Sequence, residues 1–150
     1  LSADETLMLI EAVRNSFDLS HCREYTFESG RADVISAEKL EVLKNNGVGR
    51  ISINPQTFDD SVLEIIGRKH TASEALSAYN LAKSIGFDSI NMDLIAGLPG
   101  DTIDGFKSSV DTAIANRPEN ITVHSLALKA QVHLLPRKIR FCRKMIRPQR

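Results

Sequence analysis

The chain has 150 residues, of which 42% are hydrophobic and 25% are charged, so it can bury a core and disorder is not expected over most of it. Its two cysteines, Cys22 and Cys142, lie far apart, which excludes a disulfide framework and a compact Cys-x-x-Cys metal knuckle. No apolar run approaches the roughly 18 residues of a membrane span and no signal sequence opens the chain, so we expect a cytoplasmic protein without a membrane span.

The charges are distributed unevenly along the chain. Nineteen basic and nineteen acidic residues cancel, yet seven basic residues lie between Arg137 and Arg150 and no acidic residue follows Glu119. Segment 130–150 has no regular apolar spacing, so we expect a disordered basic tail after a domain that spans 1–129. Such a tail can touch nucleic acid non-specifically, but it has no interleaved aromatic residue beyond Phe141. We interpret it as a solvated end and expect no nucleic-acid partner.

Apolar spacing and capping residues predict the elements in chain order. Ser2 with Glu5 and Thr71 with Glu74 have capping-box spacing, and apolar residues follow each pair at helical intervals. Period-two alternation bounded by glycine, proline or asparagine predicts the strands. The predicted helices cover 1–17, 36–45, 59–66, 71–85 and 102–115, and the predicted strands cover 24–28, 50–54, 89–94 and 121–126.

The stretch SINMDLIAGLPG is the most informative part of the chain. Ile90, Met92 and Leu94 alternate with Asn91 and Asp93, which predicts a strand that buries one face and turns an amide and a carboxylate to the other. The glycines and the proline that follow then end it. Parallel βα folds place their ligand chemistry where a strand runs into such a turn, so Asp93 is the first candidate site residue.

Strands separated by helices predict a right-handed, parallel α/β series. Strands buried on both faces are apolar throughout, whereas each strand here has one polar face, which holds Glu28, Asn54, Asp93 or His124. We therefore expect the sheet to curve around a polar lumen, as an open or closed TIM-like barrel does.

Each candidate also has a plainer interpretation. Asp93 before the glycine-rich turn is typical of a turn-stabilising residue, and Gln56 could cap the next helix. Glu28 and Arg68 could be a solvated strand end and an exposed loop charge. His124 could be a catalytic acid or base, although we favour a hydrogen-bonded core histidine. The remaining histidines are isolated, and we expect no metal site in this chain.

The phrase FDSINMDLIAGLPGDT resembles the radical S-adenosylmethionine (SAM) enzymes related to oxygen-independent coproporphyrinogen III oxidase, also called coproporphyrinogen dehydrogenase. The likeness extends to EYTFESGR, GVGRISINPQTFDDSVLEIIGRKHT and ITVHSLALK, and so covers residues 1–129. These blocks occur in the right order and spacing. The resemblance implies a partial (β/α)6 barrel of the radical SAM type, of which this chain supplies strands three to six.

The resemblance also implies a chemistry. In this family a 4Fe-4S cluster on a C-x-x-x-C-x-x-C loop binds S-adenosyl-L-methionine and cleaves it reductively. The resulting radical abstracts hydrogen from a porphyrinogen propionate, and decarboxylation leaves a vinyl group, which turns coproporphyrinogen III into protoporphyrinogen IX in haem synthesis. The sequence lacks that cysteine pattern, so we expect the cluster ligands outside it and the fragment alone to be inactive. The implied partners are a porphyrinogen and an electron donor.

The family's SAM-binding roles transfer to five matching positions. Glu28 resembles the carboxylate that contacts polar groups of SAM, and Gln56 and Asp93 resemble the pair at its ribose. Arg68 resembles the cation that faces the methionine carboxylate, and Ala127 resembles a position that touches adenine through its backbone. These residue types suit the chemistry, because a ribose diol fits carboxylate or amide acceptors and a carboxylate fits the fork of arginine.

Two other functions stay open from the sequence. A haem chaperone is the first, because relatives with the same barrel are thought to bind and transfer haem. A non-redox βα barrel enzyme that uses Asp93 as a general base is the second. The chain does not begin with methionine, which suggests residues upstream, and their sequence would show whether a cluster motif is present.

Overall fold

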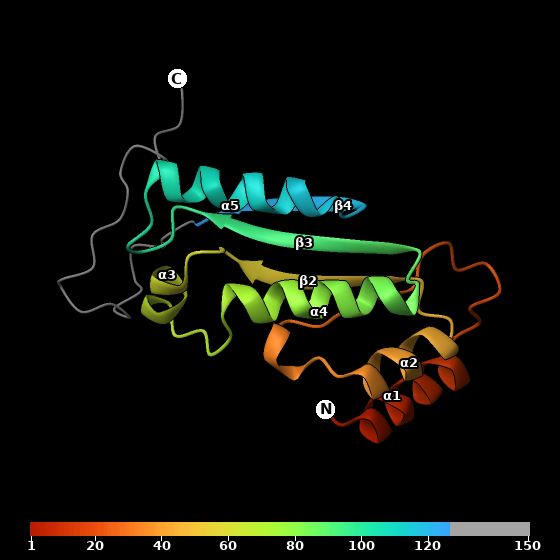
Figure 1. Ribbon diagram of the computed structural model, residues 1–150. Helices are drawn as coiled ribbons and strands as arrows, with labels where there is room; N and C mark the ends of the chain where they lie inside the picture. The colour runs from red at the N-terminus through yellow and green to blue at the C-terminus, as the bar shows by residue number, and fades with distance from the viewer. Residues whose placement is uncertain (127–150) are drawn as a thin grey trace, which may run out of the picture.

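The computed structural model describes residues 1–126, which form a four-stranded sheet with helices (Figure 1). The predicted helices and strands are all present, and within the described residues only the short 3-10 helix η1 was not predicted. The elements are α1 (Ala3–Ser16), β1 (Thr26–Glu28), η1 (Ala32–Val34), α2 (Ala37–Asn45), β2 (Arg50–Gln56), α3 (Asp60–Ile65), α4 (Ala72–Ile85), β3 (Ser89–Ala96), α5 (Ile103–Asn116) and β4 (Asn120–Ser125).

Local signals start and stop the helices as the sequence predicts. Ser2 accepts a hydrogen bond from the Glu5 amide and Thr71 accepts one from the Glu74 amide, and both capping boxes are complete. Gly86 ends α4 in the left-handed conformation, with φ of 86°, which glycine adopts without a Cβ clash. The basic tail 130–150 lies outside the described residues.

The strands pair in parallel in the order β1-β2-β3-β4. This order confirms the predicted parallel α/β series. Consecutive strands are neighbours and a helical segment connects each pair, so every strand ends at the same edge of the sheet. That edge collects the loops after β1, β2 and β3.

One face of the sheet forms the hydrophobic core. Ile51, Ile53, Ile90, Met92 and Leu94 are each at most 2% exposed. They pack in one cluster with side chains from the helices, which include Ile10, Leu40, Leu43, Tyr79, Ala82 and Ala113. The helices therefore cover this face and leave the opposite face of the sheet to polar side chains.

The structure corrects the predicted end of β2. Proline was expected to end the strand after Asn54, but β2 continues through Pro55 to Gln56. The register with β3 shifts between Ile53 and Gln56, so three steps along β2 match two along β3. A bulge of this kind leaves one residue unpaired, and the missing N–H of proline can be tolerated there.

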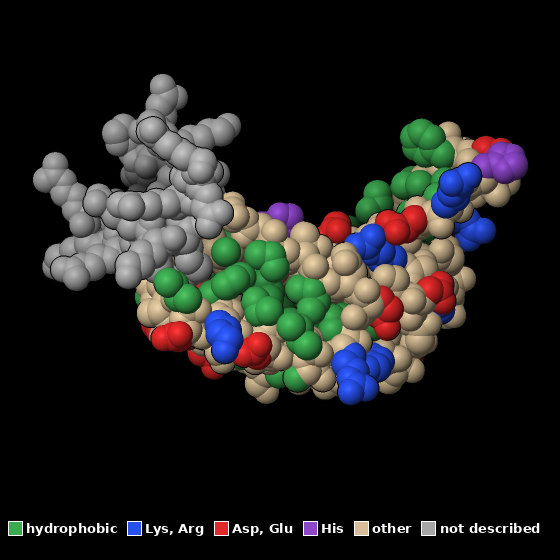
Figure 2. Space-filling model, turned by 90° about the horizontal axis from the view of Figure 1, so that it is seen from above, with side chains coloured by type: hydrophobic (Ala, Val, Ile, Leu, Met, Phe, Trp, Pro, Cys, Tyr) green, Lys and Arg blue, Asp and Glu red, His purple; other side chains and the backbone are tan. Residues whose placement is uncertain are grey.

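Part of the outer surface is hydrophobic. Ile103 and Ile114 of α5 and Val123 of β4 are each about half exposed, and hydrophobic side chains gather over these elements in Figure 2. Of the helices in residues 1–126, none combines the length and apolar character that a membrane span requires.

The core predicts a clear stability contrast. Ile53→Ala should lower the free energy of unfolding by about 2 to 4 kcal/mol, because it leaves a cavity under the central strand. Ile114→Ala, at a position that is 57% exposed, should change it by less than about 0.5 kcal/mol. Urea denaturation followed by circular dichroism measures both, and equal losses would contradict the assigned core.

Candidate functional site

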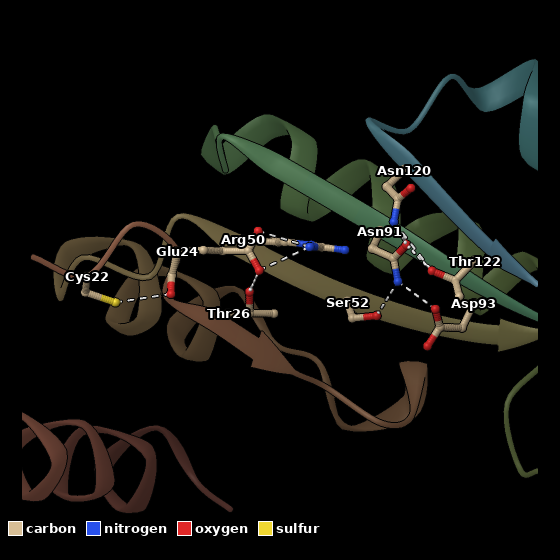
Figure 3. A network of polar contacts seen from close by, with 9 residues as sticks. All are labelled: Cys22, Glu24, Thr26, Arg50, Ser52, Asn91, Asp93, Asn120 and Thr122. Carbon is tan, nitrogen blue, oxygen red and sulfur yellow. Dashed lines mark hydrogen bonds and ion pairs between the residues drawn. The ribbon is translucent and has the colours of Figure 1, made fainter. Parts of the chain in front are cut away.

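A row of hydrogen-bonded polar side chains crosses the face of the sheet that the helices leave free (Figure 3). Asn91 lies at its centre on β3 and is 4% exposed. Its Nδ2 donates to Ser52 Oγ at 2.8 Å and to Asp93 Oδ1 at 2.6 Å. Its Oδ1 accepts from Asn120 Nδ2 at 2.8 Å and from Thr122 Oγ1 at 2.9 Å. We call these five residues the polar ladder.

Asp93 is the carboxylate of the polar ladder. Its side chain is 15% exposed, and its Oδ2 lies 3.9 Å from His124 Nε2. Within residues 1–126 no hydrogen bond reaches this oxygen, whereas Oδ1 is held by Asn91. One oxygen is therefore fixed and the other can accept a donor from a ligand.

His124 does not occupy the position that we favoured. The sequence suggested a core histidine, but its side chain is 59% exposed on β4 beside Asp93. The core interpretation is wrong because β4 is the last strand of the described sheet, and the helices cover only the opposite face. His124 therefore lines the candidate site.

Gln56 lies at the end of β2 with an unusual backbone. Its φ is 69°, in the left-handed region that costs a non-glycine residue of the order of 1 to 3 kcal/mol. The residue is 6% exposed, and its neighbour in the β2–β3 register is Leu94, next to Asp93. The bulge and the positive φ thus place Gln56 at the same edge as Asp93.

Glu28 comes to this edge from the end of a strand, and Arg68 comes from a loop. Glu28 is the last residue of β1, is exposed, and pairs in register with Ser52. Arg68, in the loop between α3 and α4, donates from Nη1 to the carbonyl of Gly30 at 3.4 Å. No carboxylate of the described residues pairs with Arg68, so its guanidinium can receive an anion. Ala127 lies outside the described residues.

Sequence reasoning missed two buried polar groups near this edge. His70, one of the isolated histidines of the sequence, is 2% exposed, with Nε2 3.4 Å from the carbonyl oxygen of Pro55, which precedes Gln56. Asp101, just after the GLPG turn, is 5% exposed, and burial raises the pKa of its carboxyl. Loop histidines and turn aspartates are usually solvated, so no local signal distinguished these two.

A separate cavity of about 490 Å³ opens at the opposite ends of the strands. Its lining includes Cys22, Arg23 and Arg50, and Arg50 pairs with Glu24 at 3.1 Å. The exposed Cys22 thus lies at the other end of β1 from Glu28. The described residues contain no group of three or more His, Cys, Asp and Glu side chains that could hold a metal ion.

Comparison with known proteins decides the family. The sequence model of the radical SAM superfamily matches residues 3–113, which is most of the chain. The chain belongs to the radical SAM superfamily. The oxygen-independent coproporphyrinogen-III oxidase-like protein HemZ of Bacillus subtilis is 43% identical over 130 residues, which cover 86% of this chain and 26% of that protein. The heme chaperone HemW of the same organism is 37% identical, over 87% of this chain and 36% of that protein.

The solved structures agree with this family. Coproporphyrinogen III oxidase (HemN) of Escherichia coli, a radical SAM enzyme, aligns with a TM-score of 0.76 and 27% identity, over 85% of this chain and 29% of that one. The predicted partial barrel of the radical SAM type is therefore confirmed. The chain spans about a quarter to a third of the length of these relatives.

The backbone at Gln56 leads to a prediction about stability. Gln56→Gly should be more stable than Gln56→Ala by about 1 kcal/mol, because only glycine adopts a positive φ without strain. Asn54 provides the control, since its φ is not positive, and there the alanine variant should be the more stable one. Urea denaturation of the four variants measures their free energies of unfolding. If the alanine variant is the more stable one at both positions, the backbone of Gln56 is not strained.

Proposed function

We propose that this chain forms part of the SAM site of a longer radical SAM oxidoreductase, of the oxygen-independent coproporphyrinogen III oxidase type. The observation that carries the proposal is Asp93, a strand-borne carboxylate with one oxygen held by Asn91 and the other directed away from it. The relative that is 43% identical, itself oxidase-like, supports the choice of class.

Asp93 and Gln56 are proposed to bind the ribose of SAM. A ribose diol offers two hydroxyl donors, and a carboxylate oxygen without another hydrogen bond accepts them with charge assistance. The Gln56 amide, held at the same edge by the bulge, adds a donor or an acceptor. The strain at Gln56 supports this role, because strained backbone persists where a side chain must be aimed.

Arg68 and Glu28 are proposed to bind the methionine end and other polar groups of SAM. The guanidinium of Arg68 provides a planar fork for a carboxylate, and its bond to Gly30 holds it near the loop after β1. Glu28, exposed at the end of β1, can accept from an ammonium or a hydroxyl. Ala127 is proposed to contact the adenine through its backbone.

The described residues fit SAM but not an iron–sulfur cluster. Oδ2 of Asp93, which accepts no hydrogen bond from the described residues, and the Arg68 guanidinium, which pairs with no described carboxylate, suit a polar cosubstrate. The single described thiol, Cys22, lies at the other end of the strands. We therefore propose that the 4Fe-4S cluster, which supplies the electron for this chemistry, is held by other parts of a longer protein. A porphyrinogen substrate and an electron donor complete the proposed reaction.

A haem chaperone is the second candidate function. The HemW relative at 37% identity favours it, because it matches over nearly the same share of this chain as the oxidase-like relative. A non-redox barrel enzyme loses its support, since the chain belongs to the radical SAM superfamily.

Asp93→Asn should weaken SAM binding about ten- to a hundredfold in a longer, cluster-loaded protein that contains this chain. The change keeps the shape but removes the charge, and charge-assisted hydrogen bonds contribute about 1.5 to 3 kcal/mol. Titration calorimetry measures the affinity, and a thermal melt should stay near wild type. Asp111→Asn, at an exposed position on α5, is the matched control. Unchanged affinity with a lowered melting temperature would make Asp93 a structural turn residue.

An anaerobic assay of the full-length protein separates the two candidate functions. With SAM and a reductant, we expect conversion of coproporphyrinogen III to protoporphyrinogen IX, followed by chromatography of the oxidised porphyrins. Asp93→Asn should lose that conversion, and Asp111→Asn should keep it. Stoichiometric haem binding without any conversion would instead assign the chain to a haem chaperone.

A further inference from the structure

Asn91 connects the Asp93 carboxylate to the other side chains of the polar ladder. The two side chains lie on the same face of β3, two residues apart, and a 2.6 Å hydrogen bond joins them. We propose that Asn91 is a positioning residue: it holds Oδ1 of Asp93 so that Oδ2 is presented to a hydroxyl donor of the ligand. This inference rests on the proposed role of Asp93 in binding the ribose of SAM.

The hydrogen bonds of Asn91 use its full capacity. A side-chain amide has two N–H donors and two acceptor lone pairs. Both donors are used, on Ser52 and Asp93, and both lone pairs are used, by Asn120 and Thr122. At 4% exposure the amide has little access to water that could replace any of these partners.

The surroundings also determine which way the amide points. Rotating it by half a turn would bring its oxygen against the Asp93 carboxylate and its N–H groups against the Asn120 N–H, so acceptors would face acceptors and donors would face donors. The Ser52 hydroxyl donates onward to Asn54 Oδ1 at 2.9 Å, so it can only accept from Asn91. The direction of donation is therefore set from β4 through β3 to β2.

This arrangement explains how Asp93 is ready to bind before the ligand arrives. A carboxylate with a free torsion would lose rotational freedom when it binds a hydroxyl, and that loss reduces affinity. Asn91 removes the freedom in advance, because its N–H holds one oxygen and the polar ladder holds Asn91.

A double-mutant cycle on SAM affinity tests the proposal in a cluster-loaded longer protein. Asn91→Ala should weaken SAM binding by about five- to twentyfold in the wild-type background, because the Asp93 carboxylate is no longer held and must lose rotational freedom when it binds. In the Asp93→Ala background the same change should weaken binding by less than about twofold, because the carboxylate through which Asn91 acts is absent. A purely structural residue would not produce that coupling.

Thr112→Val is the matched control. It removes a 2.8 Å side-chain hydrogen bond from Thr112 Oγ1 to the Ser108 carbonyl within α5, outside the polar ladder, so SAM affinity should stay within about twofold. If Asn91→Ala does not fold, Asn91→Ser keeps a polar group in the polar ladder and is put through the same cycle with the same expected result.

The outcomes separate this inference from the proposed function. Equal weakening by Asn91→Ala in both backgrounds would overturn the positioning role and leave Asp93 as a ligand residue. The positioning role would also be overturned if Asn91→Ala binds SAM as tightly as wild type while Asp93→Asn binds it weakly. If Asp93→Asn binds SAM with wild-type affinity, Asp93 does not bind the ribose. That result would contradict both the proposed function and the positioning role of Asn91.

Discussion

The alternation of side chains along the parallel pair β2 and β3 is the constraint on which the rest of the structure depends. Since successive residues point to opposite faces, burying Ile53 and Met92 under the helices sends Ser52 and Asn91 to the other face. Both are buried there, and a buried polar group without a partner costs about 1 to 3 kcal/mol. The polar ladder meets this requirement, and the same bonds hold Asp93.

The regular strand geometry of β2 is interrupted at its carboxyl end, near the candidate ligand groups. Pro55 interrupts the β2 register, and Gln56 follows with a positive φ. His70 is buried beside this turn, near the carbonyl of Pro55. Strained backbone of this kind persists only where the surroundings stabilise it, and here side chains of β2, β3 and α4 pack in one core cluster next to the turn.

Membership of the radical SAM superfamily and the HemN-like fold account for the sheet, but they do not distinguish oxidase from chaperone. The oxidase-like and the chaperone relatives match over nearly the same share of this chain, at 43% and 37% identity. The buried apolar faces and the glycine-rich turn serve folding, which both classes require. The two classes therefore differ in chemistry and not in the fold of these residues.

Local features of the sequence determined the helices, the strands and the shared face of Asn91 and Asp93, because capping boxes and period-two alternation act over a few neighbouring residues. Only the tertiary structure decided the three partners of Asn91 on neighbouring strands, which lie 29 to 39 residues away in sequence. It also decided the left-handed backbone of Gln56 and the exposure of His124. Strand register brings such groups together, and register follows from packing across the whole sheet, which no short stretch of sequence contains.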